Sequence, residues 1–154
     1  MPTQDPPLRP SGTDPAPRLG YLLKHASLGY LELTSTELEP VGITPQEWAA
    51  LNCLDEQHGL SQKEVAELLG IDRTTMVALI DQLQTQGWVE RRPHHSDRRK
   101  NTVTLTKDGH QMLRTGANVI DECERRFLAA LGEPAAEQLK TALQTVIVAN
   151  RPSP

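Results

Sequence analysis

The chain of 154 residues has a net charge of −4, and 37% of its residues are hydrophobic but only 3% are aromatic. This length suits a single domain with a mostly aliphatic core. Two cysteines, Cys53 and Cys123, exclude a disulfide framework. There is neither a signal segment nor an apolar run long enough to cross a membrane, so we expect a soluble cytoplasmic protein.

The N-terminal segment differs in composition from the rest of the chain. Residues 1–17 hold six prolines and lack apolar periodicity, which is typical of a disordered tail. Apolar residues then recur at helical spacing over about 18–39, and Pro40 and Gly42 end this predicted helix. We expect 18–150 to form one domain.

Two capping boxes predict where the next two helices begin. Thr44 and Glu47 have the spacing at which each side chain caps the backbone of the other, and the helix that they start is expected to run to about Gln57. Ser61 and Glu64 repeat the pattern at the start of a short third helix.

A fourth helix follows the third after a tight turn, and Asp72 can cap its start. Its apolar residues recur at i, i+3, i+4 and i+7, which predicts one buried stripe: Met76, Leu79, Ile80 and Leu83. A short helix, a turn and a second amphipathic helix form a helix-turn-helix unit. The second helix of such a unit enters the DNA major groove with its N-terminus first.

Candidate DNA contacts lie on this unit. Its second helix begins with Arg73, Thr74 and Thr75, opposite the buried stripe. Arginine can read guanine edges, and threonine can bond phosphate or touch a thymine methyl group. Uncapped amides near Ser61 and Gln62, at the start of the third helix, are expected to suit a phosphate.

Two β-patterned runs, Trp88–Arg92 and Thr102–Leu105, follow the fourth helix and flank a basic loop. Between Glu90 and Lys100 five basic residues outweigh two acidic ones, which gives a local charge of +3 in a chain of −4. A basic hairpin on an acidic body indicates contact with a polyanion. The predicted fold class is therefore mainly α with a small β-hairpin wing, a winged helix-turn-helix lobe over 44–106.

Strand alternation predicts which side chains of the hairpin face the core. Those expected to face inward are Val89, Val103 and Leu105, and those expected to face outward are Arg91, Thr102 and Thr104. At the tip, Arg98 and Arg99 are expected to enter an adjacent minor groove, where a narrow groove enhances the negative potential.

The end of the chain is helical in pattern. Thr106 can cap a long fifth helix that Gly132 and Pro134 end, and a last helix follows. The first, fifth and last helices carry more aliphatic surface than a winged core can cover. Because such surfaces usually mark an interface, we expect 18–39 and 107–150 to form a dimer.

These features together resemble the multiple antibiotic resistance regulator (MarR) family over Arg18–Asn150. The matching segments are GITPQEWAALNCL at Gly42–Leu54 and LSQKEVAELLGIDRTTMVALIDQLQTQGWVERRPHHSDRRKNTVTLTKDGHQML at Leu60–Leu113, with DRR at Asp97–Arg99 and Leu105-Thr106 followed by Gly109 as the most specific parts. The resemblance implies a homodimeric transcriptional regulator, usually a repressor, on a palindromic operator in double-stranded DNA. It also implies a small-ligand pocket between the dimer helices and the DNA-binding lobe.

The resemblance implies roles for residues of the recognition helix. Arg73, Thr74 and Thr75 fall where the family reads bases. The family often has a polar residue followed by arginine where this chain has Val77 and Ala78. Base readout is therefore expected to be thinner, with an apolar contact from Val77 in place of a hydrogen bond.

The wing has implied roles as well. Arg98 and Arg99 fall at the family's wing tip, with Lys100 beside them, and Asp97 is expected to brace the loop through an ion pair. Asp81 on the recognition helix is a candidate partner for a wing arginine, which would fix the wing to the helix.

Residues that sense an effector are less clearly marked. Lys24 and His25 lie near the implied pocket, where Lys24 can pair with the carboxylate of an aromatic acid, and Trp48 can form a wall. Each also fits a solvated or core side chain. A metal-sensing regulator of the same fold, with His110 as a candidate ligand, stays an alternative, although no metal-ligand spacing motif occurs and no metal or cofactor is assigned. Redox sensing by Cys123 is disfavoured, because Cys123 lies on the apolar side of the fifth helix.

Two other classes of protein compete with a regulator. An enzyme is not supported, because the chain has no phosphate-binding glycine loop, nucleophile elbow or metal-hydrolase motif. A winged helix that assembles with other proteins is a further alternative. The clustered arginines of the wing argue against it, because a protein-binding wing has no need of them.

Overall fold

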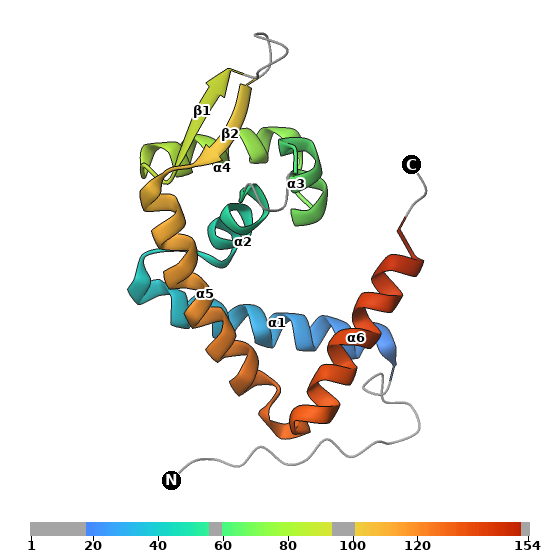
Figure 1. Cartoon of the computed structure of the whole chain (residues 1–154). Helices are drawn as coiled ribbons and strands as arrows, with labels where there is room; N and C mark the ends of the chain where they lie inside the picture. The colour runs from blue at the N-terminus through green and yellow to red at the C-terminus, as the bar shows by residue number, and fades with distance from the viewer. Residues whose placement is uncertain (1–17, 56–59, 94–100, 152–154) are drawn as a thin grey trace.

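The computed structural model describes residues 18–55, 60–93 and 101–151, which form a set of helices from which one small hairpin projects (Figure 1). Its elements are α1 (Leu19–Leu38), the 3-10 helix η1 (Glu39–Val41), α2 (Pro45–Leu54), α3 (Gln62–Leu69), α4 (Arg73–Thr85), β1 (Val89–Pro93), β2 (Asn101–Leu105), α5 (Lys107–Phe127), the 3-10 helix η2 (Ala129–Leu131) and α6 (Glu133–Ala149). The predicted fold class is confirmed. The segment 1–17, predicted to be a tail, lies outside the described residues.

The capping box predicted at the start of α2 is present. Thr44 Oγ1 accepts from Glu47 N at 3.2 Å, and the Glu47 carboxylate accepts from Thr44 N at 2.8 Å. The predicted end near Gln57 is wrong, because α2 ends at Leu54 and Asp55 adopts an extended backbone with ψ 132°. Aspartate disfavours a helix interior since its side chain competes for backbone hydrogen bonds.

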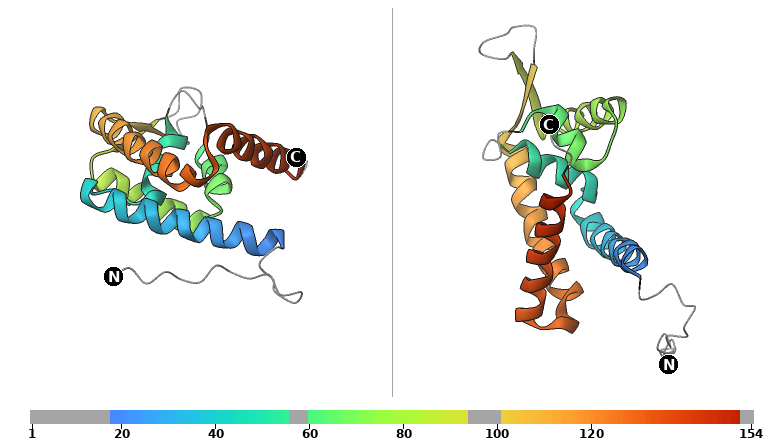
Figure 2. Two further views of the ribbon diagram at one scale, coloured as in Figure 1. Left: turned by 90° about the horizontal axis from the view of Figure 1, so that it is seen from below. Right: turned by 90° about the vertical axis from the view of Figure 1, so that its right-hand side faces the viewer.

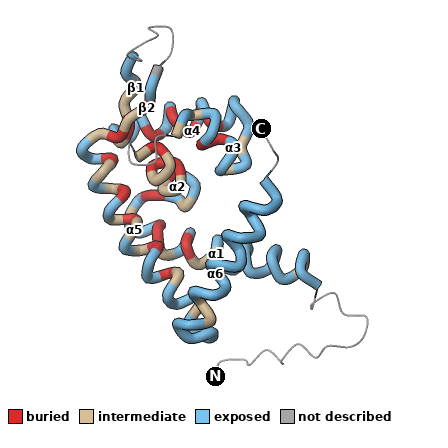
Figure 3. Tube along the Cα trace, turned by 45° about the vertical axis from the view of Figure 1, so that its right-hand side comes forward, coloured by how far each residue is buried: buried red, intermediate tan, exposed pale blue. Residues whose placement is uncertain are grey.

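The helices α2, α3 and α4 pack with the hairpin around one core, where the buried residues of Figure 3 gather. Leu51 of α2 and Val65 of α3 are fully covered there. The stripe predicted on α4 is confirmed, since its four members are all buried: Met76, Leu79, Ile80 and Leu83. The core is almost wholly aliphatic, as the composition indicates.

The two strands pair antiparallel, with Val89 opposite Leu105 and Arg91 opposite Val103. The three aliphatic residues among these four are buried, as predicted. The expectation that Arg91 faces outward is wrong, because residues directly opposite each other in an antiparallel pair share a face. Arg91 is half-buried on the inner face of the hairpin.

The outer face of the hairpin carries Thr102 and Thr104, opposite Arg92 and Glu90. Thr102 is exposed, as predicted, but Thr104 is half-buried. The Thr104 hydroxyl is covered and has no hydrogen-bond partner among the described residues. The base of the outer face is therefore less open to solvent than strand alternation alone predicts.

Two glycines allow α5 to lie directly against the winged lobe. A Cβ atom on Gly109 would stand 1.9 Å from the carbonyl oxygen of Trp88, and one on Gly116 would stand 2.2 Å from Trp48 Cδ1. The Trp48 indole N–H also donates to the carbonyl oxygen of Leu113 at 3.1 Å. A side chain at either glycine would meet backbone or an aromatic ring, so only glycine permits this approach.

A buried carboxylate connects α2 to α4. Glu47 is only 4% exposed, and its Oε1 accepts from Gln82 Nε2 at 2.6 Å and from Gln86 Nε2 at 3.2 Å. Its Oε2 accepts from the N–H and hydroxyl of Thr44 at 2.8 and 3.0 Å. Buried polar groups persist when they are hydrogen-bonded in this way. The start of α2 thus fixes the position of α4.

The helices α1 and α6 lie outside the winged lobe. α1 packs on α5, where Arg126 Nη1 lies 2.8 Å from Glu37 Oε1 and the rings of Tyr30 and Phe127 meet edge-on, 5.3 Å apart at their centroids. α6 contains no buried residue and forms a V with α5 (Figures 1 and 2). Within the described ranges, no helix combines the length and apolarity that a membrane crossing requires.

Replacing Gly116 with alanine is expected to destabilise the fold, because the new Cβ meets the Trp48 ring and one of the two must move. Overpacking of this kind costs about 1–3 kcal/mol of unfolding free energy, which urea denaturation followed by circular dichroism measures. Gly29→Ala is the matched control, since its Cβ meets only Phe127 Cε2 at an ordinary 3.6 Å. Equal urea midpoints for the Gly116→Ala variant and the wild type would contradict the close approach.

Candidate nucleic-acid interface

The start of α4 presents the residues predicted to contact bases. Arg73, Thr74 and Thr75 are exposed on its first turn, and Val77 follows with 44% of its surface exposed. Asp72 caps the helix by accepting from Thr75 N at 2.8 Å and from Thr75 Oγ1 at 2.9 Å. The hydroxyl proton of Thr75 is therefore already donated within the protein, whereas Arg73 and Thr74 project into solvent.

The start of α3 differs from the prediction. The expectation of uncapped amides near Ser61 and Gln62 is wrong for Ser61, because Ser61 N donates to Glu64 Oε2 at 2.8 Å and Glu64 N donates to Ser61 Oγ at 3.3 Å. The Ser61 N–H and hydroxyl hold the pKa of the Glu64 carboxyl below its ordinary value. A carboxylate thus lies where a phosphate was expected, and contacts from Ser61 and Gln62 stay predictions.

Arg91 ties the hairpin to the recognition helix. Its Nη2 atom lies 2.5 Å from Asp81 Oδ1, and its Nη1 atom donates to Gln84. Asp81 therefore has a wing arginine as partner, in β1 rather than at the tip. The contact of Arg91 with α4 was not predicted from the sequence, although strand alternation indicates it. Arg91 follows the inward-facing Val89 by two residues and therefore lies on the same face of the strand.

The rest of the basic hairpin is described only in part. Arg92 is exposed and pairs with Glu90 of the same strand. The tip residues predicted to contact DNA or brace the loop lie outside the described residues: Asp97, Arg98, Arg99 and Lys100. The described part of the interface is therefore α3, α4 and the base of the hairpin.

The three candidate effector residues lie in two different settings. Lys24 and His25 are exposed on α1, where the His25 ring stacks on Tyr21 with centroids 4.1 Å apart. Trp48 is half-buried between α2 and α5, and its N–H is donated to Leu113. Trp48 therefore joins α2 to α5, and binding of a ligand by any of the three residues stays a prediction.

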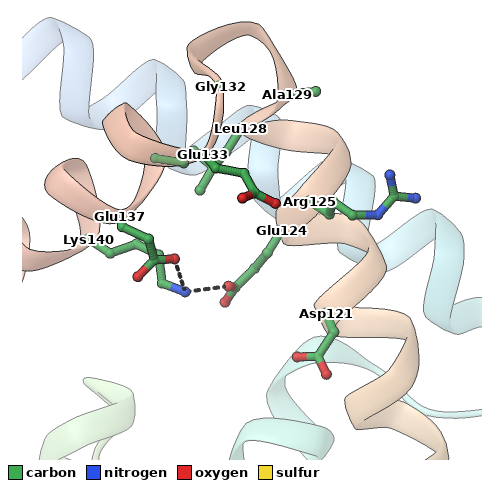
Figure 4. Close-up of a pocket in the computed structure, with 10 residues that line it drawn as sticks. Asp121, Glu124, Arg125, Leu128, Ala129, Gly132, Glu133, Glu137 and Lys140 are labelled. Atoms are coloured by element: carbon green, nitrogen blue, oxygen red, sulfur yellow. Dashed lines mark hydrogen bonds and ion pairs between the residues drawn. The ribbon is translucent and has the colours of Figure 1, made fainter.

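A cleft of about 620 Å³ lies between α5 and α6 (Figure 4). Its charged lining residues are Asp121, Glu124, Glu133, Glu137, Arg125 and Lys140. Lys140 Nζ lies 3.1 Å from Glu124 and 3.7 Å from Glu137, and so connects the two walls. Four carboxylates against two basic groups make the cleft acidic, which disfavours an anionic ligand. None of the candidate effector residues lines it.

The two cysteines show no sign of activation. Burial raises the pKa of the Cys123 thiol in α5 and of the half-buried Cys53 thiol in α2. A raised pKa keeps a thiol protonated and unreactive. Among residues 18–55, 60–93 and 101–151, no three His, Cys, Asp or Glu side chains are grouped as a metal ion would require.

Comparison with known proteins identifies the family. A family model described as "MarR family" matches residues 41–100. The transcriptional repressor MprA of Escherichia coli K12 is 32% identical over 124 residues, which cover 79% of this chain and 70% of MprA. The chain belongs to the MarR family. Another MarR-like relative, the HTH-type transcriptional repressor Rv2887 of Mycobacterium tuberculosis H37Rv, is 30% identical over 131 residues, which cover 85% of this chain and 94% of Rv2887.

Solved structures extend the likeness to the whole MarR-type fold. The transcriptional repressor CouR bound to a 23-mer DNA duplex has a TM-score of 0.79 at 31% identity, covering 90% of this chain and 98% of CouR. The MarR-family protein Rv2887 in complex with p-aminosalicylic acid has a TM-score of 0.71 at 28% identity, covering 83% of this chain and 97% of Rv2887. The predicted class is confirmed: the protein is a DNA-binding transcriptional regulator of the MarR family, and not an enzyme.

The ion pair between Asp81 and Arg91 predicts a phenotype for this MarR-family regulator. Asp81→Asn releases the Arg91 guanidinium, which can then bind the phosphates of any DNA sequence. We expect random DNA to bind more tightly, with a log–log salt slope steeper by about one. The ratio of operator affinity to random-DNA affinity should fall several-fold. Fluorescence anisotropy across a salt series measures both quantities.

The control for this variant is Glu122→Gln in α5, which makes the same charge change and releases Arg125 far along the chain from α4. It should leave the salt slope and the affinity ratio unchanged. If Asp81→Asn behaves like this control, the ion pair does not hold the wing in place.

The cap of α4 predicts a pH dependence of stability. The N–H and hydroxyl of Thr75 lower the pKa of Asp72 in the folded protein, so the unfolded chain binds that proton more readily. The stabilisation is complete above the ordinary carboxyl pKa and is lost as the pH falls through the lowered value. The difference in urea midpoint between wild type and Asp72→Ala should therefore shrink from neutral to acid pH. A constant difference would contradict this.

Proposed function

We propose that this MarR-family regulator is a homodimeric repressor of the cytoplasm that binds a palindromic operator and is released by a small aromatic acid. The observation that carries the DNA contact is the open first turn of α4, where Arg73 and Thr74 are exposed on the same helix to which Arg91 joins the hairpin through Asp81. MprA and Rv2887 are both named as repressors, which supports repression rather than activation.

Apolar side chains left open on α1 and α6 support the homodimer. Leu19 is 67% exposed, Val148 is 66% exposed, and α6 buries none of its residues. The other exposed large hydrophobic residues of the two helices are Leu22, Leu23, Leu28, Leu31, Leu139, Leu143, Val146 and Ile147. A second copy would cover this surface. We therefore assign 18–39 and 107–150 to dimerisation and 44–106 to the DNA-binding lobe.

A twofold dimer would present two α4 helices to half-sites one DNA turn apart, ~34–36 Å. The proposed contacts are Ser61, Gln62, Arg73, Thr74, Thr75 and Val77 on the lobe, and Arg98, Arg99 and Lys100 on the wing, with Asp81 and Asp97 as braces. Thr75 has a narrower role than its neighbours, because its hydroxyl proton is donated to Asp72 and only its methyl group and lone pairs remain.

An aromatic acid is the proposed effector class because Rv2887 forms a complex with p-aminosalicylic acid. The acidic cleft between α5 and α6 does not suit an anion. Lys24 and His25 on α1 supply basic groups instead, and Trp48 lies where the lobe meets α5. A ligand that displaces Trp48 would shift the lobe relative to the dimer helices.

Selection of duplexes from a random-sequence pool by the purified protein tests the DNA-binding part. We expect one twofold-symmetric sequence to be enriched and to bind with a Kd of about 10⁻⁸–10⁻¹¹ M. Arg73→Ala should weaken this binding about 10–100-fold, because a base contact of this kind contributes about 1–3 kcal/mol. Arg114→Ala, which removes an exposed arginine of α5, should not. A pool without any enriched sequence would overturn the proposal.

Titration of the protein–operator complex with salicylate tests the effector class. Release of the DNA is expected, and Lys24→Ala should raise the salicylate concentration required several-fold without changing operator affinity. Light scattering of the protein without DNA should give the mass of two chains. A complex that survives saturating salicylate and related benzoates would show that aromatic acids are not the effector.

A further inference from the structure

The open face of α4 beyond its first residue is apolar. Thr74, Val77 and Ala78 are spaced i, i+3 and i+4, which places them together on one helix face, and all three are exposed. We call these three residues the methyl patch. The larger apolar side chains of α4 other than Val77 are all buried in the core. Val77 is thus a β-branched side chain turned outward on a helix that otherwise buries its large apolar groups.

Hydrogen-bonding groups around the methyl patch are largely engaged within the protein. Thr75 donates its N–H and its hydroxyl proton to Asp72. Further along the helix, Asp81 is paired with Arg91. In the first half of α4 this leaves Arg73 and Thr74 as the polar side chains that can meet a base. Beyond Arg73 and the Thr74 hydroxyl, this part of the open face presents methyl groups: one on Thr74, two on Val77 and one on Ala78.

The major groove contains one apolar feature that matches such a surface, the C5-methyl group of thymine. We propose that the methyl patch reads thymine methyl groups beside a guanine that Arg73 reads, so that methyl contacts add selectivity to the hydrogen bonds of Arg73. This inference rests on the proposed binding of DNA by α4 and specifies the bases that it selects.

The spacing of the two contacts limits where the bases lie. Arg73 and Val77 are four residues apart, about 6 Å along the helix axis. Successive bases of one strand are about 3.4 Å apart. The guanine and the thymine of a half-site should therefore lie within about two base pairs of each other. Because valine and alanine are short, α4 must lie deep in the groove to reach the methyl groups.

Replacing thymine with deoxyuridine tests the proposal, since it removes the methyl group and leaves base pairing intact. The probe is the duplex that the wild-type protein selects from the random pool. Deoxyuridine within two base pairs of the half-site guanine should weaken binding about fourfold for each methyl group that α4 buries. The same change outside the half-sites should have no effect.

The outcomes separate this proposal from the proposed function. If the half-site with deoxyuridine binds as tightly as that with thymine, or if the selected half-site has no thymine beside its guanine, the methyl reading is overturned while sequence-specific binding stands. If no duplex is selected at all, both are overturned.

A pair of variants tests whether Val77 is the reader. Val77→Ala should weaken binding to the thymine duplex. In this variant, replacing thymine with deoxyuridine should cost little further affinity, so that the effects of the protein change and the base change are not additive. Leu68→Ala is the matched control, because it removes a 55% exposed aliphatic side chain of α3 outside the methyl patch. It should keep the full penalty, and circular dichroism should show both variants folded. A Val77→Ala protein that keeps the full penalty would exclude Val77.

Discussion

The arrangement depends on two neighbouring residues in the first turn of α2, which contact two different helices. Glu47 accepts hydrogen bonds from Gln82 of α4 and from Gln86, which caps its end, and Trp48 packs on Gly116 of α5. Separating α2 from α4 would leave a buried carboxylate without partners, which is costly. Separating α2 from α5 would expose the Trp48 ring. The recognition helix and the long helix that leads toward the proposed dimer surface are therefore both held by α2.

A second junction explains why the family pattern at Leu105-Thr106 and Gly109 is needed here. The Thr106 hydroxyl donates to the Gly87 carbonyl at 2.6 Å and accepts from Gly109 N at 3.0 Å. The Thr106 N–H donates to the Trp88 carbonyl at 3.0 Å, and Gly109 leaves room for that carbonyl. The start of β1, the end of β2 and the start of α5 thus meet at one point, so the wing has a fixed base even though its charge is concentrated toward its tip.

Features that depend on residues close together in the chain could be predicted from the sequence, whereas contacts between distant residues could not. The boxes at Thr44 and Ser61 and the buried stripe of α4 were predictable because each depends on residues three or four apart. The pairing of Glu47 with Gln82 was not predictable, since it joins residues that are distant in sequence. The outward setting predicted for Arg91 conflicts with its strand register, because Arg91 follows the inward-facing Val89 by two residues and lies opposite Val103. Tip arginines and effector residues stay predictions.

The exposed length of α6 has a consequence for how the protein responds to its own abundance. A helix of 17 residues without a buried residue gains little of the tertiary packing that stabilises most helices in proteins. Its order would then depend on the proposed association of two chains, and any equilibrium that couples folding to association obeys mass action. Dilution should unwind α6 before it affects the winged lobe. The quantity of regulator in a cell would thereby set not only how many molecules are present but what fraction of them is fully folded.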